Sequence, residues 1–68
     1  EPKDDELSKR EFDVLRLIVS GACNKDIADT LHISVRTVET HRLRIKKKLG
    51  ATSTAALVKL ALDKGLVS

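Results

Sequence analysis

The chain has 68 residues, of which 41% are hydrophobic and 34% are charged, so it allows one small domain with a modest core and excludes a second domain. Its single cysteine excludes an internal disulfide, and no apolar run approaches the roughly 18 residues of a membrane-spanning helix. Because the chain begins with Glu1 rather than Met, we expect a fragment or processed product. The charged segment 1–6 is predicted to be a linker remnant ahead of a domain at 7–68.

Positive charge is concentrated in one segment of the sequence. The formal net charge is +3, but residues 1–34 carry five Lys or Arg against eight Asp or Glu, whereas residues 35–50 carry six against one. This distribution predicts that an anionic partner meets the second of these segments.

Two helices are predicted in the first half of the chain. Ser8 and Glu11 have the spacing of a capping box, which predicts a helix over roughly 8–20. Asn24 is the candidate N-cap of a shorter helix over 24–31.

Two more helices are predicted in the second half. Ser34 and Gly50 have the residue types expected at the two ends of a helix over 35–49. Ser53, or its neighbour Thr52, is the candidate cap of a last helix over 53–64.

The fold class that these signals predict is all-α, a compact four-helix domain containing a helix-turn-helix. No alternating pattern typical of strands competes with the four helices. Only a few residues, around His32 to Ser34, separate the second and third helices, and this short connection is typical of a helix-turn-helix.

The predicted third helix has an apolar face and a polar face. On a helical wheel, Val38, Ile45 and Leu49 form a stripe that should pack into the core. The opposite face is the one that a recognition helix would offer to the major groove of DNA. It collects Arg36, Thr40, Leu43 and Lys47, with Glu39 and Arg44 beside them.

Two residues of the polar face have alternative interpretations. Leu43 is either a contact for a thymine methyl group or a stray exposed apolar residue. Glu39 would be repelled by phosphates, so it either accepts a hydrogen bond from a cytosine amino group or pairs within the helix with a residue such as Arg36 or Arg42.

The cations of this helix are candidate phosphate contacts, which position a protein on DNA without specifying sequence. These are Arg36, Arg44, Lys46 and Lys47. For Lys48 we expect instead a solvated cation that complements the helix macrodipole.

The chain from Leu7 to Val67 resembles the LuxR/NarL/FixJ (GerE-type) helix-turn-helix family. The matching motifs are Arg10-Glu11 and Val14-Leu15, Gly21 with Asn24-Lys25 and Ile27-Ala28, Ile33-Ser34, Thr37-Val38, His41, Ile45, Lys48-Leu49-Gly50, and Ala61, Gly65 and Leu66. The resemblance implies the C-terminal effector domain of a bacterial response regulator, located in the cytoplasm. Its N-terminal receiver or ligand-binding domain would be missing from this chain.

The resemblance also implies roles for individual residues. The groove-facing positions of the family fall on Glu39, Thr40 and Leu43. Its backbone-contacting positions fall on Asn24, Lys25, Thr37, His41 and the basic end of the third helix.

Three positions depart from the pattern of the family. Relatives commonly carry lysine where Glu39 stands, which implies a shifted base preference. Thr54 stands where arginine is common, and Cys23 replaces a more usual Ser or Thr.

The last helix has two apolar stripes, and a small domain cannot bury both. Leu57, Leu60 and Ala61 can face the core, and Ala56 can join them. The second stripe is either a dimer surface, as the resemblance also implies for this helix, or one edge of a broad packed face. Its members are Ala55, Val58, Lys59 and Leu62.

The leading function is sequence-specific binding of double-stranded DNA by a homodimer. The alternative is a small helical protein-interaction module with a basic face. We expect no enzyme, because the sequence has no paired carboxylates in an apolar setting and no glycine-rich phosphate loop. We expect no metal and no cofactor, because the spacing of Cys23, His32 and His41 is not that of a metal site.

Overall fold

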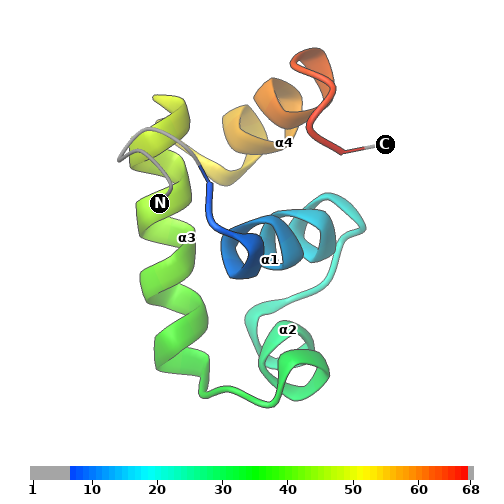
Figure 1. Cartoon of the computed structure of the whole chain (residues 1–68), viewed down its shortest axis with the longest axis vertical. Helices are drawn as coiled ribbons and strands as arrows, with labels where there is room; N and C mark the ends of the chain where they lie inside the picture. Colours follow the sequence, from blue (N-terminus) through cyan, green and yellow to red (C-terminus); the bar gives the residue numbers. More distant parts are fainter. Residues whose placement is uncertain (1–6, 68) are drawn as a thin grey trace.

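The computed structural model describes residues 7–67, which form four helices and no strand. The helices are α1 (Lys9–Val19), α2 (Asn24–Leu31), α3 (Val35–Leu49) and α4 (Thr54–Asp63). Figure 1 shows α3 running along one side of the molecule, with α2, α1 and α4 arranged beside it from one end to the other. The all-α prediction and the four predicted ranges are confirmed to within one residue at each end. The predicted linker remnant, residues 1–6, lies outside the described residues.

All four helices contribute to one core. The largest side chains that are completely buried are Leu15, Ile27, Ile45, Leu57, Val14 and Val38. Leu49 and Val58 are half-buried and pack against this cluster. Each helix therefore has one face fixed by apolar burial, the dominant favourable term in folding.

Three of the predicted helix starts have the predicted caps. The Ser8 hydroxyl accepts a hydrogen bond from the N–H of Glu11, and the Glu11 carboxylate accepts one from the N–H of Ser8, which completes the capping box. The hydroxyls of Ser34 and Ser53 accept from the first turns of α3 and α4. These side-chain oxygens satisfy backbone donors that have no partner inside the helix.

The predicted range of α2 is correct, but its predicted N-cap is wrong by one residue. Cys23, not Asn24, is the N-cap, and its side chain makes no capping hydrogen bond. Asn24 is the first residue of the helix, and its side-chain oxygen accepts a hydrogen bond from Arg42 of α3 instead. The Asn24 side chain, which local preference would use as a cap, therefore makes a long-range contact with α3 instead.

The turn between α2 and α3 is tight because His32 adopts a left-handed conformation, with φ of 58°. The next residue, Ile33, then donates its N–H to the carbonyl of Ala28 at 3.0 Å, which ends α2. Ser34 caps α3 directly afterwards. This geometry confirms the predicted helix-turn-helix connection.

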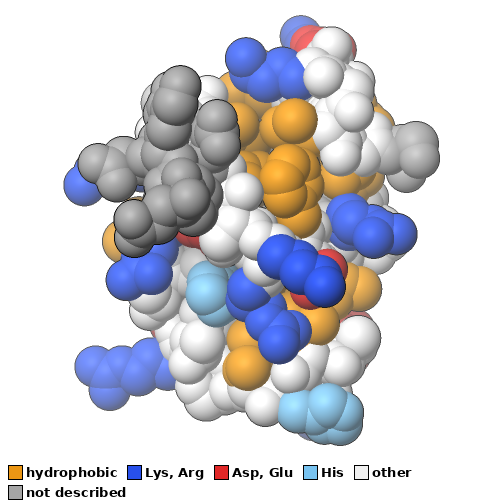
Figure 2. Space-filling model, viewed as in Figure 1, with side chains coloured by type: hydrophobic (Ala, Val, Ile, Leu, Met, Phe, Trp, Pro, Cys, Tyr) orange, Lys and Arg blue, Asp and Glu red, His pale blue; other side chains and the backbone are white. Residues whose placement is uncertain are grey.

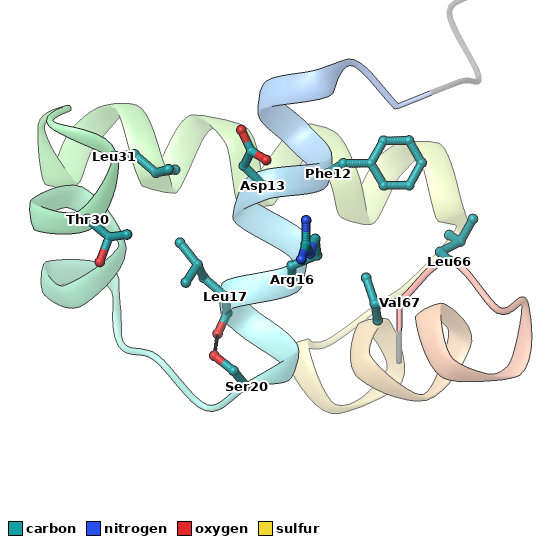
Figure 3. Close-up of a pocket in the computed structure, with 9 residues that line it drawn as sticks. All are labelled: Phe12, Asp13, Arg16, Leu17, Ser20, Thr30, Leu31, Leu66 and Val67. Carbon is teal, nitrogen blue, oxygen red and sulfur yellow. Dashed lines mark hydrogen bonds between the residues drawn. The ribbon is translucent and has the colours of Figure 1, made fainter.

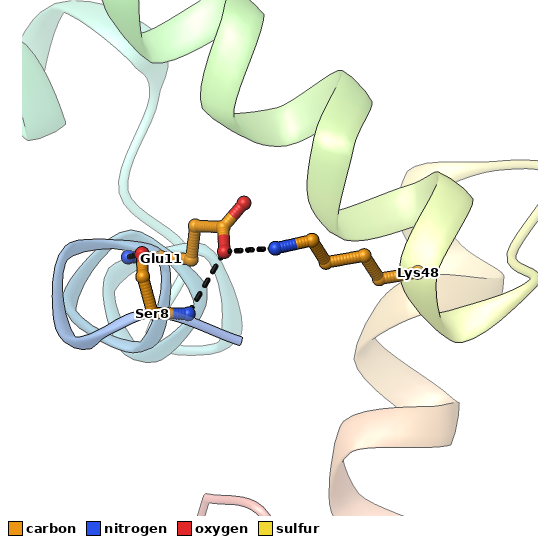
Figure 4. Close-up of polar contacts among 3 residues, drawn as sticks. All are labelled: Ser8, Glu11 and Lys48. Carbon is orange, nitrogen blue, oxygen red and sulfur yellow. Dashed lines mark hydrogen bonds and ion pairs between the residues drawn. The ribbon is translucent and has the colours of Figure 1, made fainter. Parts of the chain in front are cut away.

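The prediction that Lys48 is a solvated cation is wrong. Its Nζ lies 2.7 Å from Oε1 of Glu11, whose side chain is only 4% exposed, and the same oxygen accepts from the N–H of Ser8 at 2.8 Å (Figure 4). Burial raises the pKa of Glu11, but the hydrogen bonds from Lys48 and Ser8 and the charge of Lys48 outweigh it, so the pKa is lowered. The pair joins the first turn of α1 to the last turn of α3.

The missing cap of α2 gives a prediction for Cys23. We expect Cys23→Ser to raise the free energy of unfolding by about 1 kcal/mol, because a hydroxyl at an N-cap accepts from a first-turn N–H that the thiol leaves without a partner. Urea unfolding of the 68-residue chain measures the change. Cys23→Ala is the control, since it offers no acceptor; an equal gain in both variants would contradict the capping explanation.

The ion pair between α1 and α3 gives a second prediction. Glu11→Gln keeps an oxygen for the N–H of Ser8 but removes the charge that faces Lys48, so we expect the free energy of unfolding at pH 7 to fall by about 1–2 kcal/mol. Because the folded-state pKa of Glu11 is lowered, its contribution is present above the ordinary value of 4.5 and is lost as the pH falls through the folded-state value. Urea unfolding of both proteins at several pH values tests this.

The control for that measurement is Glu39→Gln. Glu39 is exposed, and no ion pair to it forms within residues 7–67. Its substitution should change the free energy of unfolding by no more than about 0.5 kcal/mol. A loss in Glu11→Gln that stays constant down to pH 3 would contradict the ionic role of Glu11.

Candidate nucleic-acid interface

Helix α3 presents one face to the core and the other to the surface. Val38 and Ile45 are completely buried, which fixes the rotation of the helix about its axis. Residues on the opposite side of the helix are therefore held outward, because successive residues are about 100° apart. Figure 2 shows Lys and Arg side chains standing out along the edge of the molecule where Figure 1 draws α3.

All three candidate base-reading residues are exposed. Leu43 is 67% exposed, the highest value of any large hydrophobic side chain in residues 7–67. The Thr40 hydroxyl donates to the carbonyl of Arg36 at 3.2 Å, so its oxygen still has a lone pair directed elsewhere. Leu43, Thr40 and Glu39 thus share a surface on which an apolar group, a hydroxyl and a carboxylate lie close together.

The intrahelical partner proposed for Glu39 is absent. Within residues 7–67, Glu39 forms no ion pair with Arg36 or Arg42, and the guanidinium of Arg42 is bonded to Asn24 and Thr54 instead. The structure therefore contradicts the interpretation of Glu39 as a member of an intrahelical ion pair. The other interpretation, a contact with a cytosine amino group, stays a prediction.

The candidate backbone-contacting residues divide into two groups. Four cations are exposed or half-buried on α3, and Lys25 is exposed in the first turn of α2. The α3 cations are Arg36, Arg44, Lys46 and Lys47. The polar members make contacts inside the protein: the Thr37 N–H and hydroxyl contact the Ser34 hydroxyl at 3.1 and 2.9 Å, and the Asn24 oxygen accepts from Arg42.

His41 is half-buried and has an unusual environment. Its ring nitrogen Nδ1 is buried and has no hydrogen-bond partner. The other ring nitrogen, Nε2, is therefore the atom through which His41 can form a hydrogen bond with another molecule.

Arg42 is the polar residue that the sequence analysis left out of the site. Its guanidinium donates to Oδ1 of Asn24 at 2.9 Å and to Oγ1 of Thr54 at 2.6 Å, which joins α3 to the first residues of α2 and α4. Its position at the border of the apolar stripe of α3 is the only sequence signal for this role, and its partners lie 18 and 12 residues away.

The second stripe of α4 is mostly at the surface. Ala55 and Lys59 are exposed, and Leu62 is 48% exposed. Val58 is half-buried and packs against the core instead. The stripe therefore presents three of its four residues to solvent, while Leu57 and Ala61 are completely buried on the other side.

A groove of about 850 Å³ is lined by residues other than the candidate DNA-contacting and dimerisation residues (Figure 3). Its walls come from α1, α2 and the segment after α4. The lining residues are Phe12, Asp13, Arg16, Leu17, Ser20, Thr30, Leu31, Leu66 and Val67. None of the site residues predicted from the sequence is among them.

Metal-binding and membrane features are absent from the part of the chain that the structure describes. No cluster of three or more His, Cys, Asp or Glu side chains there could hold a metal ion. No helix there is long and apolar enough to span a membrane.

The chain belongs to the luxR family of bacterial regulatory proteins, whose GerE model matches residues 5–61. This is a family of DNA-binding transcription regulators, not a class of enzymes. The chain is 58% identical over 64 residues to the transcriptional regulatory protein MctR of Rhizobium johnstonii, covering 94% of this chain and 30% of MctR. It is 51% identical over 61 residues to the oxygen regulatory protein NreC of Staphylococcus aureus, covering 90% of this chain and 28% of NreC.

Solved structures share the same fold. The transcription factor GerE superposes with a TM-score of 0.85 at 32% identity, over 91% of this chain and 92% of GerE. VqmA of Vibrio cholerae, in a complex with ligand and DNA, superposes with a TM-score of 0.87 at 39% identity, over 90% of this chain and 27% of VqmA. The chain therefore spans about a third of the length of the curated relatives MctR and NreC.

Proposed function

We propose that this domain binds specific sequences of double-stranded DNA, with α3 as the recognition helix in the major groove. The observation that carries the proposal is the outer face of α3, where Leu43, 67% exposed, lies among exposed cations while the inner face is buried. An apolar side chain among cations fits a surface that meets both thymine methyl groups and phosphates. The complex of VqmA with DNA supports the same use of this fold.

Base recognition falls to the three exposed residues of this face. Leu43 contacts a thymine methyl group, and the Thr40 hydroxyl offers a hydrogen bond to a base edge. Glu39, which has no internal ion pair within residues 7–67, accepts from the amino group of cytosine. A carboxylate in the groove rejects positions where it would face only acceptors, so it contributes specificity by repulsion as well as attraction.

Phosphate contacts fall to the surrounding cations and to the start of α2. Arg36, Arg44, Lys46 and Lys47 on α3, and Lys25 on α2, supply charge on the exposed surface. Further hydrogen bonds to phosphate oxygens come from Thr37, Asn24 and the Nε2 atom of His41.

The domain acts as a homodimer on DNA through α4. Ala55 and Leu62 are exposed and offer a small and an apolar side chain, which allow two helices to approach around a two-fold axis. Lys59 lies on the same stripe and contributes the apolar stem of its side chain. Val58 lies at the edge of this surface, since it also packs against the core.

The full protein is a bacterial response regulator in the cytoplasm. The relatives are two to four times longer than the matched region, which supports an N-terminal receiver or ligand-binding domain ahead of this one. In that arrangement residues 7–68 form the C-terminal effector domain, and residues 1–6 belong to the linker.

The exposed charge of α3 predicts a salt-dependent interaction. We expect the double variant Arg36→Ala and Lys47→Ala to weaken binding to every duplex similarly and to reduce the slope of log affinity against log salt by about 1.8, since each lost phosphate contact removes about 0.9. Fluorescence anisotropy of a labelled mixed-sequence duplex, titrated at several salt concentrations, measures both quantities.

The control for this measurement is a double variant that loses the same two positive charges at positions outside α3. Lys9 and Lys64 are exposed and lie outside α3, so Lys9→Ala with Lys64→Ala should leave the slope almost unchanged. An equal change in both double variants would show that net charge alone binds DNA. No binding by the wild-type domain at low salt would favour a basic face that meets an acidic protein.

The α4 surface predicts a difference between paired and single binding sites. Leu62→Glu should weaken binding to a duplex with two half-sites by about tenfold, while binding to one half-site changes little, because a charge at the two-fold axis repels its copy. A duplex selected from random sequences by the wild-type domain supplies the sites, and gel-shift titration measures the affinities. Thr52→Glu adds the same charge at an exposed position outside the stripe and is the control; equal losses on both duplexes for Leu62→Glu would exclude this surface.

A further inference from the structure

Arg42 joins the starts of two helices to the middle of a third. Its two terminal nitrogens donate to Oδ1 of Asn24 at 2.9 Å and to Oγ1 of Thr54 at 2.6 Å. Asn24 and Thr54 are the first residues of α2 and α4, and all three side chains are half-buried. We call this set the Arg42 clamp.

The chemistry of the guanidinium fixes the orientation of the Asn24 amide. A guanidinium has five N–H donors and no acceptor, so only the oxygen of the amide can face it. The amide nitrogen, Nδ2, with its two N–H donors, is therefore held on the side away from Arg42. Phosphate oxygens only accept hydrogen bonds, so this orientation is the one that suits a DNA backbone.

The start of α2 leaves Asn24 available for this role. Cys23 occupies the N-cap position, so the Asn24 side chain is not used to cap the helix. Without Arg42, the amide could turn and present its oxygen outward, where it would be repelled by a phosphate.

The electrostatics of the clamp are unfavourable for the folded domain alone. A cation near the N-terminal ends of two helices faces the positive ends of their macrodipoles. Within residues 7–67, no carboxylate lies within ion-pair distance of Arg42, and both of its partners are neutral. A positive charge held without a counter-ion suits a surface that approaches a polyanion.

We propose that Arg42 is a positioning residue for DNA binding, which holds Asn24 with its amide nitrogen directed toward a phosphate. The inference rests on the proposed function and adds a residue that acts through Asn24 and makes no DNA contact of its own.

The first test replaces Asn24. Asn24→Asp keeps oxygens for Arg42, and so keeps the clamp, but removes the N–H donors; Asn24→Ala removes them without adding charge. We expect Asn24→Asp to unfold at a urea concentration close to or above that of wild type, and Asn24→Ala at a lower one, because Arg42 then loses an acceptor. Both variants should remain folded in the absence of urea and bind a mixed-sequence duplex about tenfold more weakly. The salt slope for Asn24→Ala should equal that of wild type, because the lost contact is neutral. Wild-type affinity in both variants would overturn the proposal.

The second test replaces Arg42 and combines it with Asn24. Arg42→Gln removes the donor-only group, and its affinity should fall by the same factor as that of Asn24→Ala. If Arg42 acts through Asn24, the double variant should bind no more weakly than either single one. Lys47→Gln removes the same charge from a proposed phosphate contact and is the control, with an expected reduction of the salt slope by about 0.9. The proposal would be overturned if Arg42→Gln reduced the slope equally and if the affinity losses of the two single variants multiplied in the double variant, because Arg42 would then contact a phosphate itself.

Two measurements keep the outcomes separate. Urea unfolding shows whether Arg42→Gln still folds; if it does not, the Asn24 variants decide the question. Absence of wild-type binding would refute the proposed function, whereas wild-type binding that Asn24→Asp and Asn24→Ala leave unchanged would refute only the role of the clamp.

Discussion

The burial of one face of α3 is the constraint on which the rest of the structure depends. A chain of 68 residues buries only about 60% of the surface that its unfolded form would expose, so each helix has one face in the core and leaves the other outside. In α3 the inner face is held by Val38 and Ile45, which are completely buried. Rotation of the helix by one residue would expose them, so packing alone holds Leu43 and its neighbours outward. The surface that we propose for DNA recognition is therefore a consequence of how the core is packed.

Apolar packing fixes the rotation of α3, but polar contacts fix its position along its axis. The ion pair of Lys48 with Glu11 ties its last turn to α1, and the Arg42 clamp ties its middle to α2 and α4. Both contacts are directional, whereas apolar burial is not. The groove binding that we propose for α3 needs both kinds of contact, because a shift along the helix axis would preserve much of the burial and yet displace the proposed base-reading side chains.

The sequence predicted what local rules control. The capping box of Ser8 and Glu11 spans three residues, and Ser34 and Gly50 act within one turn of the helix ends, so the helix boundaries follow from neighbouring residues. The outward set on α3 followed from periodicity. The roles of Lys48, Asn24 and Arg42 did not, because their partners lie 37 and 18 residues away and no local preference encodes such distances. Asn24 shows the competition most clearly: its capping preference yields to a donor from another helix.

The Arg42 clamp offers a physical reason why residue 54 is threonine and departs from the pattern of the family. The resemblance described above places threonine here at a position where arginine is common in the family. Here the Thr54 hydroxyl accepts from Arg42 at 2.6 Å, and an arginine would bring a second guanidinium, which has no acceptor, against the first. Like charges at that distance repel, and both would lie near the N-terminus of α4. Threonine at this position and arginine at residue 42 are therefore compatible with each other in a way that two arginines are not. Since Arg42 contacts both Asn24 and Thr54, we expect substitutions at residues 42 and 54 to be interdependent.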